Sequence, residues 1–127
     1  MRVLKTRGFE RFAKSEGITD VQLVAAIKAA ERGLIDADLG GGIIKLRIAR
    51  PGKGKSGGFR TLIAYKVKAR AVFLYGFAKS ARANIAPSEL ETLKLAAADI
   101  QASTDNVITT MVEERKLLEV DYGEKEN

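Results

Sequence analysis

Three apolar segments between residues 43 and 78 constrain the fold of this chain most strongly. Residues 43–49 alternate apolar and basic side chains with the two-residue period of a half-buried strand. Residues 50–58, with four glycines and one proline, predict a hairpin connection to a second strand over residues 59–68. Residues 71–78 are apolar enough to predict a strand buried on both faces. A sheet is therefore expected at the centre of the fold.

Helical patterns precede this predicted sheet. Residues 2–6 predict a short strand and residues 8–14 a short helix. Thr19, followed three residues later by Gln22, forms the sequence pattern of a capping box and predicts a helix over residues 20–32.

Further helical patterns follow the sheet. Pro87 marks a helix start, and Ser88 with Glu91 predicts its capping box. The apolar stripe of this helix is Leu90, Leu93, Ala97 and Ile100. A second helix is expected to bury Val107, Ile108, Met111 and Val112. An acidic, frayed end is expected at residues 121–127.

Length and composition exclude several classes of protein. A chain of 127 residues predicts one compact domain. No apolar run approaches the roughly 18 residues of a membrane-spanning helix, and no signal-peptide pattern follows the basic N-terminus. The sequence contains neither cysteine nor histidine, which excludes a thiolate nucleophile, a Ser-His-Asp triad and zinc ligation by these residues. Any catalysis must use Lys, Arg, Tyr, Ser, Thr or carboxylates.

Charge is distributed unevenly along the chain. Residues 1–86 contain eighteen basic and six acidic residues, whereas residues 87–127 contain four and ten. No acidic residue occurs between Asp38 and Glu89, and this interval holds eleven basic residues. An uncompensated positive surface attracts polyanions, so RNA, DNA or an acidic protein would each fit as a partner. The alternative is that these basic residues only solvate the surface.

The Gly- and Lys-rich segment at residues 52–58 resembles a phosphate-binding loop only superficially. It lacks the order GxxxxGK[ST] and precedes a strand rather than a helix, which disfavours an NTPase. A flexible basic loop in contact with a phosphate backbone fits better, and a plain surface hairpin is the alternative.

Several basic side chains are predicted to form one concave patch. Lys45 and Arg47 point to the same side of their strand, roughly 6.6 Å apart. Arg60 and Lys66 share a face of the next strand and join the patch if the two strands pair. The alternative is a solvated sheet face.

Two other groups of side chains allow competing interpretations. Tyr75 and Phe77 fit the core better than a stacking platform, and only Phe77, near the strand exit, supports a hypothesis of base stacking. Asp36 and Asp38 have no other metal-ligand type nearby, so we interpret them as solvating a loop.

The order of helix, Gly-rich break, KLRIARPGKGKSGGFR, apolar strand, FAKSARANI and acidic helix resembles the RelE/ParE superfamily of toxins from bacterial toxin-antitoxin modules. The resemblance covers residues 1–102, and the segment KGKSGGFR running into a strand is typical of the HigB branch. It implies an α+β fold, with N-terminal helices packed on a twisted antiparallel sheet of three to four strands, followed by C-terminal helices. Residues 1–102 would form the toxin domain, and residues 103–127 a C-terminal helix and acidic tail of the same domain.

The resemblance also implies a function. Members cleave mRNA at the ribosome, by attack of a ribose 2′-hydroxyl on the adjacent phosphate, and are neutralised by a cognate antitoxin, here expected to be of helix-turn-helix type. No cofactor and no metal are expected, and the location would be cytoplasmic. The expected catalytic residues are Lys45, Arg47, Arg60, Lys79 and Arg82. The expected RNA-binding residues are Arg50, Lys53, Lys55, Lys66 and Phe77.

Within this catalytic set, Arg60 matches the arginine that holds the scissile phosphate, and Lys79 or Arg82 would assist the leaving group. A lysine whose pKa is depressed by its cationic neighbours would serve as base. Phe77 stands where relatives can have tyrosine, and no tyrosine follows Lys79, which leaves the acid-base assignment open. Two alternatives remain: a nucleic-acid-binding domain without catalysis, and a ParE-like gyrase inhibitor.

Overall fold

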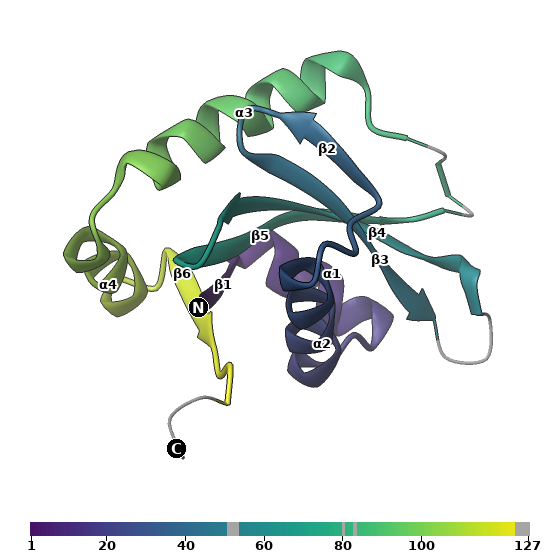
Figure 1. Ribbon diagram of the computed structural model, residues 1–127, viewed down its shortest axis with the longest axis horizontal. Coiled ribbons are helices and arrows are strands. Elements are labelled where there is room, and N and C mark those ends of the chain that lie inside the picture. The colour runs from purple at the N-terminus through teal and green to yellow at the C-terminus, as the bar shows by residue number, and fades with distance from the viewer. Residues whose placement is uncertain (51–53, 80, 83, 124–127) are drawn as a thin grey trace.

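The computed structural model describes residues 1–50, 54–79, 81, 82 and 84–123, and for residues 54–57 it describes the backbone alone. These residues form an α+β fold built on a six-stranded sheet in the order β2-β3-β4-β5-β1-β6 (Figure 1). The elements in chain order are β1 (Arg2–Thr6), α1 (Arg7–Glu16), α2 (Asp20–Glu31), β2 (Ala37–Gly40), β3 (Ile43–Arg50), β4 (Gly54–Lys66), β5 (Arg70–Ala78), α3 (Pro87–Ala102), α4 (Asp105–Glu113) and β6 (Leu117–Val120). None of the helices described is both long and apolar enough to cross a membrane.

The three central strands confirm the alternation found in the sequence. In β3, residues Ile44, Leu46 and Ile48 are buried on one face, while Arg47 on the other face is exposed. β5 is buried along most of its length, as predicted for a strand with apolar side chains on both faces. β4 begins at Gly54, inside the segment predicted to be a loop, because its first residues extend the pairing with β3.

The sheet is larger than expected and is not wholly antiparallel. We predicted three to four strands, but β2 and β6 add four residues each at the two edges. β1 pairs with β5 in parallel, and its other neighbour, β6, is antiparallel. Both edge strands are too short to show a period in the sequence, and their pairing partners decide their conformation.

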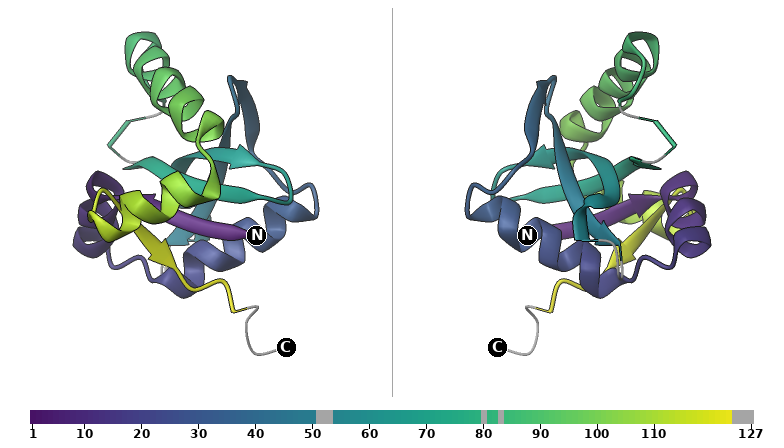
Figure 2. Two further views of the ribbon diagram at one scale, coloured as in Figure 1. Left: turned by 90° about the vertical axis from the view of Figure 1, so that its left-hand side faces the viewer. Right: turned by 90° about the vertical axis from the view of Figure 1, so that its right-hand side faces the viewer.

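Helices cover both faces of the sheet (Figure 2). α1 and α2 pack on one face around Phe9, Leu23, Ile27 and Phe73. α3 and α4 contribute Ala97, Ile100 and Ile108 to a second core on the opposite face. The N-terminal and C-terminal helices therefore lie on different sides of the sheet, which the family resemblance had not specified.

The helix ends confirm one capping prediction and correct another. Thr19 and Gln22 form the predicted capping box at the start of α2. At α3 the predicted box of Ser88 and Glu91 is wrong. The N-cap is Ala86, whose backbone N–H donates to Glu89 at 3.0 Å, because Pro87 occupies the first helical position.

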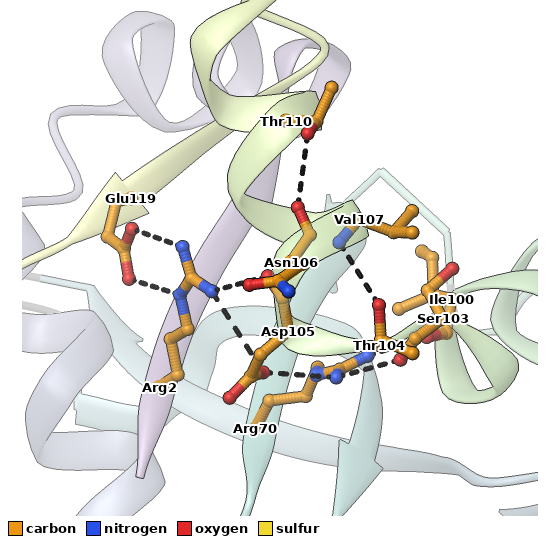
Figure 3. Close-up of polar contacts among 10 residues, drawn as sticks. All are labelled: Arg2, Arg70, Ile100, Ser103, Thr104, Asp105, Asn106, Val107, Thr110 and Glu119. Atoms are coloured by element: carbon orange, nitrogen blue, oxygen red, sulfur yellow. Dashed lines mark hydrogen bonds and ion pairs between the residues drawn. The ribbon is translucent and has the colours of Figure 1, made fainter.

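Two arginines connect the junction between α3 and α4 to the sheet (Figure 3). Arg70 begins β5, one residue before the predicted start of this strand, and its side chain is 4% exposed. It donates to the carbonyl oxygens of Ile100 at 2.7 Å and Ser103 at 2.9 Å, and to the carboxylate of Asp105 at 3.2 Å. Arg2 of β1 donates to the carbonyl of the same Asp105 and to a carboxylate of β6. Because carbonyls at a helix C-terminus carry partial negative charge, Arg70 stabilises the end of α3, while Arg2 ties the first residue of α4 to β1.

Candidate nucleic-acid interface

Three of the predicted catalytic cations lie together on β3 and β4. The register places Arg47 directly opposite Arg60, and Lys45 opposite Leu62. Strand alternation puts Lys45 and Arg47 on the same face as Ile43, which packs in the core beneath α3 and α4. The structure therefore brings Lys45, Arg47 and Arg60 to one place, on the sheet face opposite α1 and α2.

A carboxylate sits among these three cations. Arg47 Nε donates to Asp36 Oδ1 at 2.8 Å, Lys45 Nζ lies 3.7 Å from Oδ2, and Arg60 Nε lies 4.0 Å from Oδ2. The side chain of Asp36 is 16% exposed, and its backbone N–H donates to the carbonyl of Lys45. Our interpretation of Asp36 as a loop-solvating residue is therefore wrong. Asp38 is different, because its carboxylate accepts from the N–H of Gly40 within the β2–β3 turn.

Arg60 is the most buried of the three cations. Its side chain is 5% exposed, against 46% for Arg47 and 16% for Lys45. Within the described part of the chain, its Nη1 is buried without a hydrogen-bond partner. Among the described residues its one ion pair is the 4.0 Å contact with Asp36, so the guanidinium keeps most of its capacity to bind an anion.

Two aromatic residues of β5 pair with β4 at the positions of Arg60 and Leu62. Phe77 lies opposite Arg60, and Tyr75 lies opposite Leu62. The Arg82 guanidinium sits over the ring of Phe77, 5.7 Å from its centroid. Phe77 is only 4% exposed, so the predicted base-stacking role is wrong: no face of this ring is open to a base.

Arg82 is fixed by several partners. Its Nη2 donates to Glu89 at 2.6 Å, and its Nη1 donates to the hydroxyl of Tyr75 at 3.3 Å. The hydrogen bond from Arg82, followed by that from the N–H of Ala86, lowers the pKa of Glu89. The same pair raises the pKa of Arg82, so both groups stay charged. Arg82 thus lies beside the cation cluster, already bound to a carboxylate.

The remaining predicted residues are dispersed. Arg50 lies against Phe59, 5.6 Å from its ring centroid, and Phe59 belongs to the core on the α1 and α2 side, so Arg50 does not join the patch. Lys66 lies six residues further along β4, about 20 Å from Arg60 by strand rise, so its predicted place in the patch is wrong. Lys79 is exposed at the end of β5, where its N–H donates to the carbonyl of Gly58.

Two predicted RNA-binding residues fall where the structure gives no side chain. Lys53 lies outside the described residues. Lys55 belongs to β4, but only its backbone is described.

Two surface cavities are candidate locations for the site. A cavity of about 460 Å³ borders the cluster and is lined by Asp36 and Arg47 together with Ala26, Ala29, Leu34, Ile35 and Leu46. A cavity of about 530 Å³ lies elsewhere, between α1, α4 and β6, where basic side chains alternate with Glu10 and Glu119. We place the candidate site at the cation cluster beside the first cavity, because Lys45, Arg47 and Arg60 converge there on the single carboxylate of Asp36. Among the described residues no group of three or more carboxylates is placed to hold a metal ion.

Reasoning from the sequence missed Asp36, Tyr75 and Glu89. Asp36 directly precedes β2, a strand that was not predicted, so nothing in the sequence indicated that its side chain faces β3. Glu89 ends the acid-free interval of the sequence, and only the path of the chain between β5 and α3 brings it to Arg82.

Residues 1–120 match a family model described as the RelE toxin of the RelE/RelB toxin-antitoxin system. A search of curated proteins found no significant match.

Proposed function

Because the chain belongs to the RelE toxin family, we propose that it is a ribosome-dependent mRNA endoribonuclease that cleaves by attack of a 2′-hydroxyl on the adjacent phosphate. The observation that carries the proposal is the convergence of Lys45, Arg47 and Arg60 on one position of the sheet. A family of toxins with antitoxins also implies a cognate antitoxin as partner. We propose that this antitoxin is of helix-turn-helix type and that the toxin acts in the cytoplasm, where ribosomes translate mRNA.

The reaction makes three demands on the site. The 2′-hydroxyl loses a proton as its oxygen bonds to phosphorus, the phosphorane gains negative charge, and the 5′-oxygen leaves with a proton. The products are a 2′,3′-cyclic phosphate and a 5′-hydroxyl. Metal ions are one means of meeting the charge demand, and fixed cations are another.

The cation cluster meets the second demand. Arg47 and Arg60 are opposite each other on two paired strands, and both side chains reach Asp36, so both are positioned before substrate arrives. Cations fixed in a partly buried site stabilise developing negative charge without the cost of reorganisation. Arg60 suits the non-bridging phosphate oxygens best, because its buried Nη1 has no partner among the described residues.

We assign proton transfer to two lysines, Lys45 and Lys79. Lys45 lies within the cluster, and Lys79 is exposed at the end of β5 nearest to Phe77. An ammonium can protonate the leaving oxygen, and a neutral lysine can accept the proton of the 2′-hydroxyl. Arg82 is a weaker candidate for leaving-group assistance, because Glu89 already binds it.

The test compares mRNA cleavage by Lys45→Ala, Arg47→Ala and Arg60→Ala with that of the wild type, in a translating extract and on free RNA. We expect Arg47→Ala and Arg60→Ala each to cleave roughly 100-fold more slowly, the typical loss when one stabilising group is removed from a charged transition state. Lys14→Ala is the control, since Lys14 is an exposed cation on α1, which covers the other face.

Undiminished cleavage by all three variants would remove the proposed site. Salt-sensitive RNA binding without cleavage products would instead indicate a non-catalytic binding domain. Inhibition of DNA supercoiling with intact translation would indicate a gyrase inhibitor.

A further inference from the structure

Asp36 places one negative charge among three positive ones. Its two oxygens lie 2.8 Å from Arg47 Nε, 3.7 Å from Lys45 Nζ and 4.0 Å from Arg60 Nε. The carboxylate therefore lies where an anion contacting all three cations would lie. The cluster as a whole keeps an excess of two positive charges.

The carboxylate satisfies these cations unequally. Arg47 makes a hydrogen bond of ordinary length with it, whereas Arg60 is only at the outer limit of an ion pair. Arg60 is 5% exposed, and its Nη1 has no partner in the described part of the molecule. A buried, incompletely paired guanidinium is costly, so a larger anion that reached Arg60 would bind with a stronger driving force than the carboxylate does.

We propose that Lys45, Arg47 and Arg60 form a subsite for a single phosphodiester group of a polynucleotide, and that Asp36 occupies this subsite until the phosphodiester displaces it. The inference rests on the proposed function only for the identity of the polynucleotide as RNA. A carboxylate and a phosphodiester each present two oxygens with one negative charge, and arginine binds both with parallel N–H donors.

The surroundings of Asp36 allow the exchange. Asp36 directly precedes the edge strand β2, and the cavity of about 460 Å³ that it shares with Arg47 provides room into which its side chain can turn. Asp36 thus acts as an internal competitor that weakens binding of any phosphate at this place. It also keeps three adjacent cations from repelling one another in the free protein.

The test uses a fluorescein-labelled, 2′-O-methyl RNA decamer, which cannot undergo 2′-hydroxyl attack, with binding followed by anisotropy at several salt concentrations. Asp36→Asn keeps the shape of the side chain and removes its charge. We expect Asp36→Asn to bind roughly three- to tenfold more tightly than the wild type, with a salt dependence steeper by about one released counterion. Inorganic phosphate, as a competitor, should also bind Asp36→Asn more tightly.

Asp38→Asn is the matched control. It removes the same charge two residues away, but the Asp38 carboxylate accepts from the N–H of Gly40 and forms no ion pair with any residue that the structure describes. Its affinity should stay within twofold of the wild type. Equal tightening by Asp38→Asn would show a general charge effect and overturn the proposal, as would an Asp36→Asn variant that binds no tighter. Tighter binding of inorganic phosphate without tighter binding of the decamer would also overturn it.

A measurement on the wild type covers the case in which Asp36→Asn does not fold. In NMR spectra, the side-chain carboxyl signal of Asp36 and the Nε–H signal of Arg47 should both shift as the decamer is added, because their mutual hydrogen bond is lost. A shift at Arg47 with an unchanged Asp36 carboxyl would contradict displacement. The proposed function is measured separately by cleavage: binding that follows this pattern without any cleavage supports the subsite and removes the nuclease.

Discussion

Arg60 and Arg70 lie on the same face of the sheet, the one that packs against α3, and their side chains are 5% and 4% exposed. Arg70 donates to two carbonyl oxygens at the end of α3 and to Asp105, all within 3.2 Å. Arg60 has one carboxylate at 4.0 Å and an Nη1 that meets no acceptor in the described residues. The difference between these two buried arginines separates a structural cation from one that is available to a ligand.

The location of each arginine explains this difference. Arg70 meets the C-terminal end of α3, where helix carbonyls lack partners within the helix and attract cations. Arg60 on β4 pairs with Phe77 on β5. The ring of Phe77 contacts Arg82, and Arg82 binds Glu89 in the first turn of α3. At that end of the helix the backbone offers N–H donors rather than carbonyls, so the helix backbone provides no acceptor for an arginine. The C-terminal end of α3 therefore provides a carbonyl acceptor for Arg70, whereas Arg60 has the carboxylate of Asp36 at 4.0 Å.

The largest expected effect tests this comparison directly. Arg70→Met should lower the free energy of unfolding by about 3 kcal/mol, because it leaves two carbonyl oxygens unbonded in a largely buried site. Urea unfolding measures this loss. Cleavage per folded molecule should stay within a few-fold of the wild type. Arg60→Met is the counterpart, with a smaller loss of stability and a strongly reduced rate of cleavage. A reversed result, with Arg60→Met the less stable variant, would contradict the assignment.

A third buried cation gives a smaller effect that depends on pH. Burial lowers the pKa of Lys5, but hydrogen bonds to Asp20 and Glu10 outweigh it and raise this pKa overall. The hydrogen bond from Lys5 lowers the pKa of Glu10. The contribution of Glu10 is therefore complete above its ordinary pKa of 4.5 and is lost as the pH falls through the lower value of the folded state. That of Lys5 is present below its ordinary pKa of 10.5 and is lost as the pH rises through the raised value.

We accordingly expect the difference in unfolding free energy between the wild type and Glu10→Gln to be largest near neutral pH and to shrink as the pH falls below 4.5. Urea unfolding at a series of pH values measures it. Glu16→Gln, at the last residue of α1, is the control and should show no such trend. A difference that does not change with pH would mean that Lys5 and Glu10 do not stabilise the fold as an ion pair.

The smallest expected effect concerns Lys66. It shares a strand with Arg60 but lies at the other end, beside Arg70. Lys66→Ala should change cleavage and decamer binding by less than twofold, because a charge about 20 Å away in solvent is screened at physiological salt. A loss of cleavage comparable with that of Arg47→Ala would mean that the interface extends along β4 and that the two ends of this strand do not differ in function.

Parts of this fold could be predicted because their signals are local. The strands β3, β4 and β5 follow from two-residue alternation, and α2 follows from Thr19 and Gln22, since each pattern lies within a few residues of chain. Lys45, Arg47 and Arg60 could be grouped because a hairpin places its strands side by side. The short edge strands and the parallel pairing of β1 with β5 could not, because each depends on a partner far away in the sequence.

The sequence by itself determined that a basic, acid-free stretch would build adjacent strands and that its chemistry would use neither histidine nor cysteine. Only the tertiary structure decided which cations are satisfied. Arg60 and Arg70 both lie next to apolar strand residues, and their sequence neighbours do not show which of them meets acceptors in the fold. The acceptors that bind Arg70 come from α3 and α4, and the carboxylate that reaches Arg60 comes from the residue before β2. An ion pair depends on distance in space, and the distance between residues far apart in sequence is fixed only when the sheet and its helices have packed.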